Sequence, residues 1–338
     1  MSVHRSDWVD YAKGLGIILV VYAHVVRGLV SAGFDVPSVL SLVVDSIVYS
    51  FHMPLFFFLS GLFFIDSLNR RSLGGMLFSK IDTIIYPYIV WSLLQGGMEV
   101  ILSTYTNGHV TFAEVLTLWE PRAQFWFLYA LFLIFLVWSV IYAYLSSKYT
   151  ILIFSFASFL YLVQSWFDGV YWLSVLVKNS VFFMFGVFFR EYNLYQYLSS
   201  RIGLVYLTLA FVSGQYLFHF HYGYTYADKG IFLLVLALVS ISFTISFLTR
   251  FPSRLLAYIG GASMAIYLMH ILAGSGVRVI LNKLFIVDEL IVHIVVGTLA
   301  GVILPLIALK LIGILKIPYV FSAPIGSGTV KLLSKIRK

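Results

Sequence analysis

The chain consists of long apolar runs separated by a few charged or turn-rich residues. A hydrocarbon core about 30 Å thick requires roughly 20 apolar residues in a helix, and about ten runs approach that length. They lie near residues 14–31, 42–65, 81–104, 125–145, 149–166, 171–189, 202–219, 230–248, 255–274 and 290–315. We therefore expect an all-α, polytopic integral membrane protein that forms a single domain over residues 1–338, with a basic tail from about residue 318.

Composition supports this class and excludes several others. Only 11% of the 338 residues are charged, whereas soluble domains carry about 25%. With no cysteine, the chain has no disulfide framework, thiolate metal site or cysteine nucleophile. No Walker, HExxH or GxSxG pattern is present, which argues against an ATPase, a zinc protease or a serine hydrolase. We expect no metal and no bound cofactor. We attribute the net charge of +8 to the basic residues that orient the cytoplasmic loops of a membrane protein. We therefore expect no nucleic-acid partner.

The basic residues also predict the orientation of the chain. With the N-terminus placed in the cytoplasm, fifteen of the 22 Lys and Arg residues fall on the inner side, five fall outside and two lie within runs. Basic residues accumulate in cytoplasmic loops. This asymmetry predicts about ten spans with both termini cytoplasmic.

The first run carries a stripe of polar residues. An ionisable group in the bilayer core costs at least about 2.5 kcal/mol, so each one indicates a role. Lys13 and His24 are eleven residues apart, which places them on one helix face with His24 about 16 Å deeper. Arg27 and Asp10 lie at the edges of the same stripe. Alternatively, Lys13 is only an orienting charge and His24 is hydrogen-bonded to a neighbouring helix.

A second polar face lies on the next run. Asp45 and His52 are seven residues apart and share a face, and His52 reaches a depth similar to that of His24. Pro54 removes a helix hydrogen bond near His52. Two imidazoles at mid-membrane are difficult to explain by packing alone. The alternative for His52 is a hydrogen bond that belongs to a proline kink.

Other polar residues are open to two interpretations. Lys178 and His270 lie within later runs; Lys178 could extend to the interface, and His270 could lie near the outer end and be partly hydrated. Arg70, Arg71 and Lys80 flank a loop after the second run. Such a cluster can bind phosphates, and it is also what orientation alone requires.

These residues belong to blocks that resemble the acyltransferase 3 family. Residues 8–24, WVDYAKGLGIILVVYAH, resemble its opening helix, in which ten residues separate a basic residue from a histidine. Residues 52–61, HMPLFFFLSG, resemble its second-helix signature in the form found in the fucose 4-O-acetylase-like branch. Further blocks follow in the family's order over about residues 7–320, namely WFLY at 126–129, FFMFG at 182–186 and SMAIYLMH at 263–270.

The resemblance implies a multi-pass O-acetyltransferase of the bacterial inner membrane. Such an enzyme moves acetyl from cytosolic acetyl-CoA to a hydroxyl of an exopolysaccharide, a lipopolysaccharide or a lipid-linked glycan precursor. By position, His24 matches the essential histidine and Lys13 the basic residue of the opening motif. The family often has closely spaced arginines before a Pro-Tyr pair, whereas residues 80–88, KIDTIIYPY, keep one basic residue. The basic partner therefore remains undecided among Lys80, Arg70 and Arg71.

We assign candidate roles on this basis. His24 is the expected general base, with His52 as a second catalytic candidate. The candidate donor- or substrate-binding residues are Asp10, Lys13, Asp45, Arg70, Arg71, Lys80, Trp126, Tyr129, Lys178 and His270. Expected partners are acetyl-CoA, a glycan acceptor, membrane lipid and polysaccharide-assembly proteins.

Two rival functions use the same residues differently. A transporter or flippase could use buried His and Lys to relay protons or to bind an anionic substrate. It would be expected to show two related halves, and no such repeat is evident in the sequence. A non-catalytic partner in polysaccharide assembly would not need the His24 and His52 pair.

Overall fold

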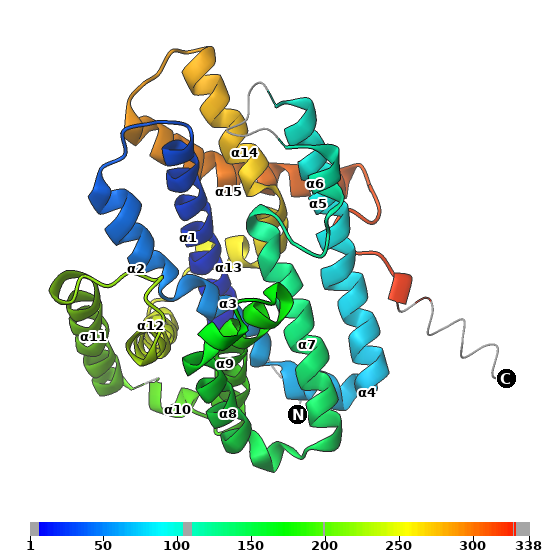
Figure 1. Ribbon diagram of the computed structural model, residues 1–338, viewed down its shortest axis with the longest axis vertical. Helices are drawn as coiled ribbons and strands as arrows, with labels where there is room; N and C mark the ends of the chain where they lie inside the picture. The colour runs from blue at the N-terminus through cyan, green and yellow to red at the C-terminus, as the bar shows by residue number, and fades with distance from the viewer. Residues whose placement is uncertain (1–6, 104–109, 199, 327, 329–338) are drawn as a thin grey trace. The chain divides into compact units, whose positions relative to one another are not determined.

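The computed structural model describes residues 7–103, 110–198, 200–326 and 328, and every regular element in these ranges is helical (Figure 1). This confirms the all-α prediction. The helices are α1 Asp7–Ser31, α2 Asp45–Tyr49, α3 His52–Gly61, α4 Phe64–Lys80, α5 Tyr86–Ile101, α6 Phe112–Leu116, α7 Trp126–Tyr144, α8 Thr150–Leu162, α9 Tyr171–Glu191, α10 Tyr195–Leu198, α11 Arg201–Tyr216, α12 Ile231–Arg250, α13 Arg254–Gly261, α14 Ser263–Lys283 and α15 Leu290–Ile314. Short π-helical turns at Val39–Val44, Ile81–Ile85 and Leu217–His221 precede or extend α2, α5 and α11.

The length and composition of these helices are those of a multi-pass membrane protein. Within the described ranges, nine helical segments are long and apolar enough to cross a bilayer, the longest being the 38-residue segment Phe64–Ile101. The apolar helix Ser147–Leu162, which corresponds to the fifth expected run, is shorter than 18 residues. The cytoplasmic position of the termini stays a prediction, and residues 329–338 of the expected basic tail lie outside the described residues.

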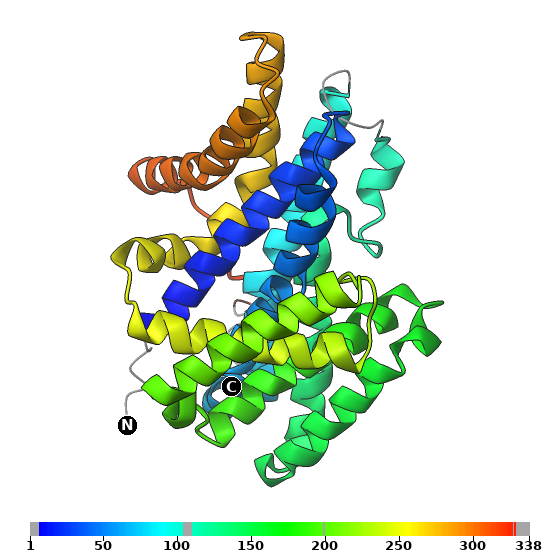
Figure 2. The same ribbon diagram turned by 90° about the vertical axis from the view of Figure 1, so that its left-hand side faces the viewer.

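The described residues cluster into two compact units. The first takes those of Met1–Phe56 and Asn193–Lys316, and the second takes those of Phe57–Thr104, Gly108–Tyr192 and Ile317–Lys338. Within the first unit α1 packs against α13, α14 and α15, while α11 pairs with α12 and α14 pairs with α15 (Figure 2). Within the second unit α7 packs against α4 and α9, and α8 packs against α9. The helix that carries His24 therefore has most of its neighbours in the C-terminal half of the sequence.

Two glycines allow α1 and α13 to make close backbone contact. A Cβ placed on Gly260 of α13 would overlap the carbonyl oxygen of Asp10, and a Cβ on Gly14 of α1 would overlap the carbonyl of Leu256. Small residues at helix crossings permit such close approach in membrane proteins. The contact holds α13 against the part of α1 that contains Lys13.

Gly260→Ala should therefore lower the free energy of unfolding by about 1–3 kcal/mol, because the added methyl group must displace backbone atoms. The measurement is the unfolding midpoint of the full chain in mixed detergent micelles. Gly261→Ala is the matched control, since a Cβ at that neighbouring position meets open space. Equal midpoints for the two variants would show that the crossing is not tightly packed.

Two expected boundaries are wrong. The ninth run, predicted at 255–274, is divided into α13 and α14, and α14 continues to Lys283. Arg278 lies in this extension, where its guanidinium donates to the Gly28 carbonyl oxygen of α1 at 2.6 Å. The loop expected around residues 66–80 is instead helix α4, interrupted only at Ser72, whose φ of 60° is non-helical.

Candidate active site

Helix α1 places its polar residues along one stripe, as the spacing predicts. It is continuous from Asp7 to Ser31, so Lys13 and His24 share a face about 16 Å apart along the axis. The Lys13 ammonium lies 3.6 Å from a carboxylate oxygen of Asp10, and both side chains are about a quarter exposed. Lys13 and Asp10 therefore form a partly hydrated pair at the beginning of the helix, away from His24.

The side chain of His24 packs against His270 of α14. The two ring centroids are 5.0 Å apart, and His270 is only 1% exposed. Its Nδ1 lies 2.8 Å from the carbonyl oxygen of Tyr267. Because a carbonyl only accepts, Nδ1 carries the hydrogen in this bond, and Nε2 of the neutral ring keeps a lone pair. That Nε2 is buried and has no hydrogen-bond partner among the described residues.

The burial of His270 corrects the expected position of this residue. The sequence suggested a partly hydrated site near the outer end of a helix. Because α14 begins at Ser263 and extends to Lys283, His270 lies in its first half and faces α1 instead. No pattern in the sequence indicates that His24 and His270 are neighbours.

His52 follows a break between α2 and α3. Its Nδ1 donates to the Val48 carbonyl oxygen at 2.7 Å, and its ring packs edge-on against Tyr49 with the centroids 4.5 Å apart. The turn at Ser50 and Phe51 precedes Pro54, which has no N–H to donate to the Ser50 carbonyl. His52 is thus bonded at this break to the Val48 carbonyl, and not to the Ser50 carbonyl that Pro54 leaves without a donor. His52 also lies within electrostatic range of His24.

Arg27 of α1 and Asp45 of α2 form an ion pair. The guanidinium Nη2 lies 2.8 Å from one carboxylate oxygen of Asp45 and Nε lies 3.1 Å from the other, and Asp45 is 5% exposed. The guanidinium carbon lies 3.5 Å from the ring centroid of Tyr49 and 5.4 Å from that of Tyr226. Both carboxylate oxygens of Asp45 thus face Arg27, which makes Arg27 the residue that Asp45 orients.

Arg27 and Tyr226 were not among the expected site residues. Arg27 had a sequence signal, because it lies on the polar stripe of α1 at a depth comparable to that of Asp45 on the next helix. Tyr226 lies in a loop about 180 residues beyond Asp45 in sequence. It is held near Asp45 by a bond from its backbone N–H to Ser46 Oγ at 2.7 Å. No local pattern indicates that contact.

The expected phosphate-binding residues lie in the second unit and have different neighbours. Arg70 Nε donates to the Asp66 carbonyl of its own helix at 3.0 Å, and Arg71 donates to Ser79 Oγ at 2.7 Å. The Lys80 ammonium lies 3.8 Å from the ring centroid of Phe135. Arg70 and Arg71 are exposed, whereas Lys80 is half-buried. The three residues thus occupy a helix and its kink, not an open loop.

The other expected binding residues of this unit are separately engaged. Trp126 packs near Phe57 with the ring centroids 6.3 Å apart. Tyr129 lies 6.1 Å from the ring of Tyr88 and 6.1 Å from the ring of Tyr171. Lys178 forms an ion pair with Asp168. Each residue thus has its own set of neighbours in the second unit.

No three His, Asp or Glu side chains of the described residues are grouped closely enough to hold a metal ion. The polar centre of the first unit is instead the set His24, His52, His270, Arg27 and Asp45, which we call the histidine cluster. Imidazoles at such a cluster can accept and return protons. An ion pair beside them supplies a fixed local charge distribution.

Comparisons with known proteins indicate the family of this chain. A family model described as an acyltransferase domain matches residues 6–310. The nodulation protein NolL of Mesorhizobium japonicum is 28% identical over 135 residues, which are 40% of this chain and 35% of that protein. The chain thus aligns with about a third of that relative's length. No solved structure matches the chain. Because the family model covers nearly all of the chain, the protein belongs to the acyltransferase 3 family of membrane acyltransferases.

Proposed function

We propose that this protein transfers an acetyl group from acetyl-CoA to a hydroxyl group of a cell-surface carbohydrate, with His24 as the general base. The observation that supports this most strongly is the packing of His24 against His270, whose buried Nε2 retains a lone pair. The resemblance of residues 52–61 to the fucose 4-O-acetylase-like branch supports a sugar hydroxyl as acceptor.

The reaction requires one proton acceptor that later acts as a donor. A neutral His24 removes the proton from the acceptor hydroxyl as its oxygen attacks the thioester carbonyl carbon. The resulting tetrahedral adduct breaks its C–S bond, and the coenzyme A thiolate takes the proton from the His24 imidazolium. The products are the O-acetylated sugar and free coenzyme A, so His24 returns to its starting form.

The donor is expected to be bound through its phosphates by basic side chains. Lys13, Arg70, Arg71 and Lys80 are the candidates, because guanidinium groups donate in pairs to phosphate oxygens and an ammonium adds a mobile charge. Arg70 and Arg71 are exposed, so a soluble donor can reach them. The charge bias of the sequence predicts that all four are cytoplasmic.

The test is an acetyl-transfer assay with the full chain purified in lipid nanodiscs. Acetyl-CoA is supplied with surface glycans from a bacterial cell, coenzyme A release is followed as free thiol, and the glycans are analysed by mass spectrometry. The expected result is thiol release that depends on the glycan, together with glycans 42 mass units heavier per acetyl group. Glycan movement across vesicles that contain the protein, without acetylation, would instead support a flippase.

A further inference from the structure

Several buried side-chain atoms of the described residues have no hydrogen-bond partner. They are Ser92 Oγ, Gln164 Oε1, Gln215 Oε1, His219 Nε2, His270 Nε2, His293 Nδ1 and Thr298 Oγ1. A buried polar atom without a partner destabilises the fold, so each of them calls for an explanation. The three imidazole nitrogens matter most for proton transfer, because an imidazole can hold or accept a proton near neutral pH.

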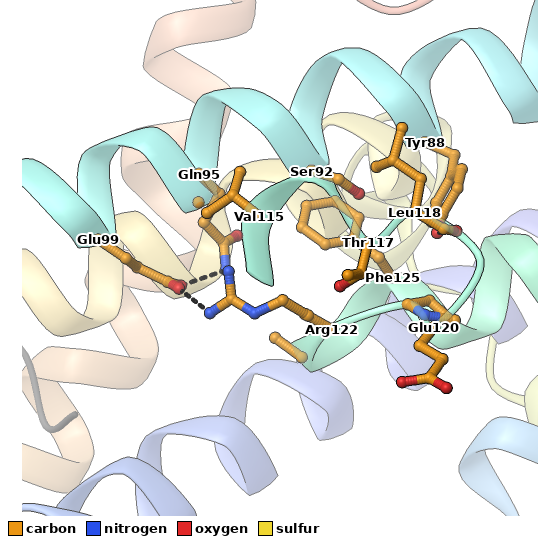
Figure 3. Close-up of a pocket in the computed structure, with 13 residues that line it drawn as sticks. Tyr88, Ser92, Gln95, Glu99, Val115, Thr117, Leu118, Glu120, Arg122 and Phe125 are labelled. Atoms are coloured by element: carbon orange, nitrogen blue, oxygen red, sulfur yellow. Dashed lines mark hydrogen bonds and ion pairs between the residues drawn. The ribbon is translucent and has the colours of Figure 1, made fainter. Parts of the chain in front are cut away.

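The surroundings of Ser92 explain its unpaired hydroxyl. Its Oγ lines a hollow beside α5 (Figure 3), which has room for about one water molecule. The other polar groups there bond to one another, since the Arg122 guanidinium donates to Glu99 at 2.6 Å. The Gln124 amide likewise donates to Gln95 at 2.7 Å. A single water molecule is sufficient to satisfy Ser92 Oγ, so this atom does not indicate a ligand.

His270 differs from the other two histidines in the ring that it contacts. The rings of His219 and His293 pack against phenylalanines. The ring of His270 packs instead against His24, with the centroids 5.0 Å apart. His270 is 1% exposed, whereas His24 is half-buried. A substrate can therefore contact His24 while His270 stays enclosed beside it.

Close packing of α14 and α15 on α1 holds the two rings at this separation. A Cβ on Gly301 of α15 would lie 2.5 Å from a methyl group of Val21 and 3.6 Å from the His270 carbonyl oxygen. Gly274, one turn after His270 on α14, is also in contact with a side chain of α1. His270 therefore cannot move away from His24 unless this packing opens.

The bond at Nδ1 determines what the Nε2 atom of His270 can do. Because Nδ1 donates to the Tyr267 carbonyl oxygen at 2.8 Å, Nε2 can only accept. In this structure Nε2 has no donor among the described residues. Two imidazoles whose centroids are 5.0 Å apart can bring one nitrogen of each to about 2.9 Å, since rotation about χ2 is soft. Catalytic hydrogen bonds are often long before the substrate binds and shorten in the loaded complex.

We propose that His270 positions His24 for catalysis: its Nε2 accepts the hydrogen of one His24 nitrogen, which leaves the lone pair of the other nitrogen for the acceptor hydroxyl. This role rests on the proposed acetyl transfer. When His24 takes the proton of the hydroxyl, both of its nitrogens carry hydrogen, and the bond to His270 becomes charge-assisted and stronger. The proton then passes from His24 to the coenzyme A thiolate, and His270 stays neutral throughout.

Two substitutions separate this role from a purely structural one. The asparagine amide reaches the position of Nδ1, so His270→Asn can keep the bond to Tyr267 but offers no acceptor to His24. The glutamine side chain is one carbon longer, and its amide oxygen can take the place of Nε2. In the acetyl-transfer assay, His270→Asn should lower kcat by about 10–100-fold, the effect of one hydrogen bond to a charged group, and His270→Gln by less than about threefold. Neither should change the KM for acetyl-CoA.

Equal kcat values for folded His270→Asn and His270→Gln would overturn the positioning role. If the asparagine variant lacks a cooperative unfolding transition, His270→Leu replaces it, because leucine suits a buried position and also offers no acceptor. In the His24→Gln background, His270→Asn should lower the residual rate no further, since residues that act as a unit are not additive. A further loss there would also overturn the role. An inactive parent would refute the proposed acetyl transfer itself.

His219 is the matched control for His270. Its Nδ1 donates to the Tyr224 carbonyl oxygen at 3.1 Å, and its Nε2 is buried without a described partner. It is 7% exposed and lies in the same unit, but its ring packs against Phe218. His219→Asn and His219→Gln should therefore both keep the parental kcat. A loss in His219→Asn equal to that in His270→Asn would show that contact with His24 is not the cause, and the proposal would be wrong.

Discussion

Replacing His24 with glutamine is expected to reduce the kcat of acetyl transfer by a factor of about 10²–10⁴, the usual contribution of a positioned general base. Glutamine keeps a polar side chain beside His270 but cannot accept a proton at neutral pH. Because the donor phosphates are assigned to other residues, the KM for acetyl-CoA should change little. The measurement is thiol release at saturating glycan, with the unfolding midpoint as a check on folding.

The matched control for this substitution is His293→Gln. His293 lies in the same unit and is 2% exposed. Its Nε2 donates to the Val287 carbonyl oxygen at 2.8 Å, and its ring packs against Phe34. It therefore shares the burial of a membrane histidine without belonging to the histidine cluster. A folded His24→Gln variant that turns over as fast as His293→Gln would show that His24 is not the base.

The sequence predicts the class of fold well because a bilayer leaves few alternatives. Backbone groups in hydrocarbon must be bonded internally, so each apolar run must become a helix. Errors arise where charges seem to mark a boundary. The ninth run is predicted to end at residue 274, short of Arg278, but α14 continues to Lys283 and Arg278 is bonded to Gly28 of α1. Such a bond joins residues 250 apart in sequence, and no local pattern contains it.

Prediction of the candidate site succeeds within one helix and fails between helices. The spacing of Lys13 and His24 determines their shared face because α1 is regular. The contact between His24 and His270 depends on how α14 is registered against α1, which follows from packing at glycines such as Gly274 and Gly301. The pairing of Asp45 with Arg27 likewise depends on the approach of two helices. Residue types and spacing thus identify the candidate site residues, whereas tertiary packing determines which of them contact one another.

Asp45→Asn is expected to lower the free energy of unfolding by about 3 kcal/mol, because it leaves the partly buried Arg27 charge without its counter-ion. Asparagine keeps the size of the side chain, so the loss reports charge and not volume. The expected value lies at the low end for buried pairs, since the Arg27 side chain remains 34% exposed. The measurement is reversible unfolding of the full chain in mixed micelles, at constant detergent ratio.

Asp66→Asn is the control for burial, because it removes one partner of a more exposed ion pair and should lower the free energy of unfolding much less than Asp45→Asn. Asp66 pairs with Arg190 at 3.3 Å, with side chains 30% and 45% exposed, and exposed pairs contribute only about 0–1 kcal/mol.

The double variant Arg27→Met with Asp45→Leu removes both buried charges together, so it should recover most of the stability lost in Asp45→Asn. Full recovery of stability with loss of acetyl transfer would show that the pair serves the histidine cluster and not the fold. A double variant as unstable as the single one would mean that the packing of the Tyr49 and Tyr226 rings depends on the guanidinium beside them.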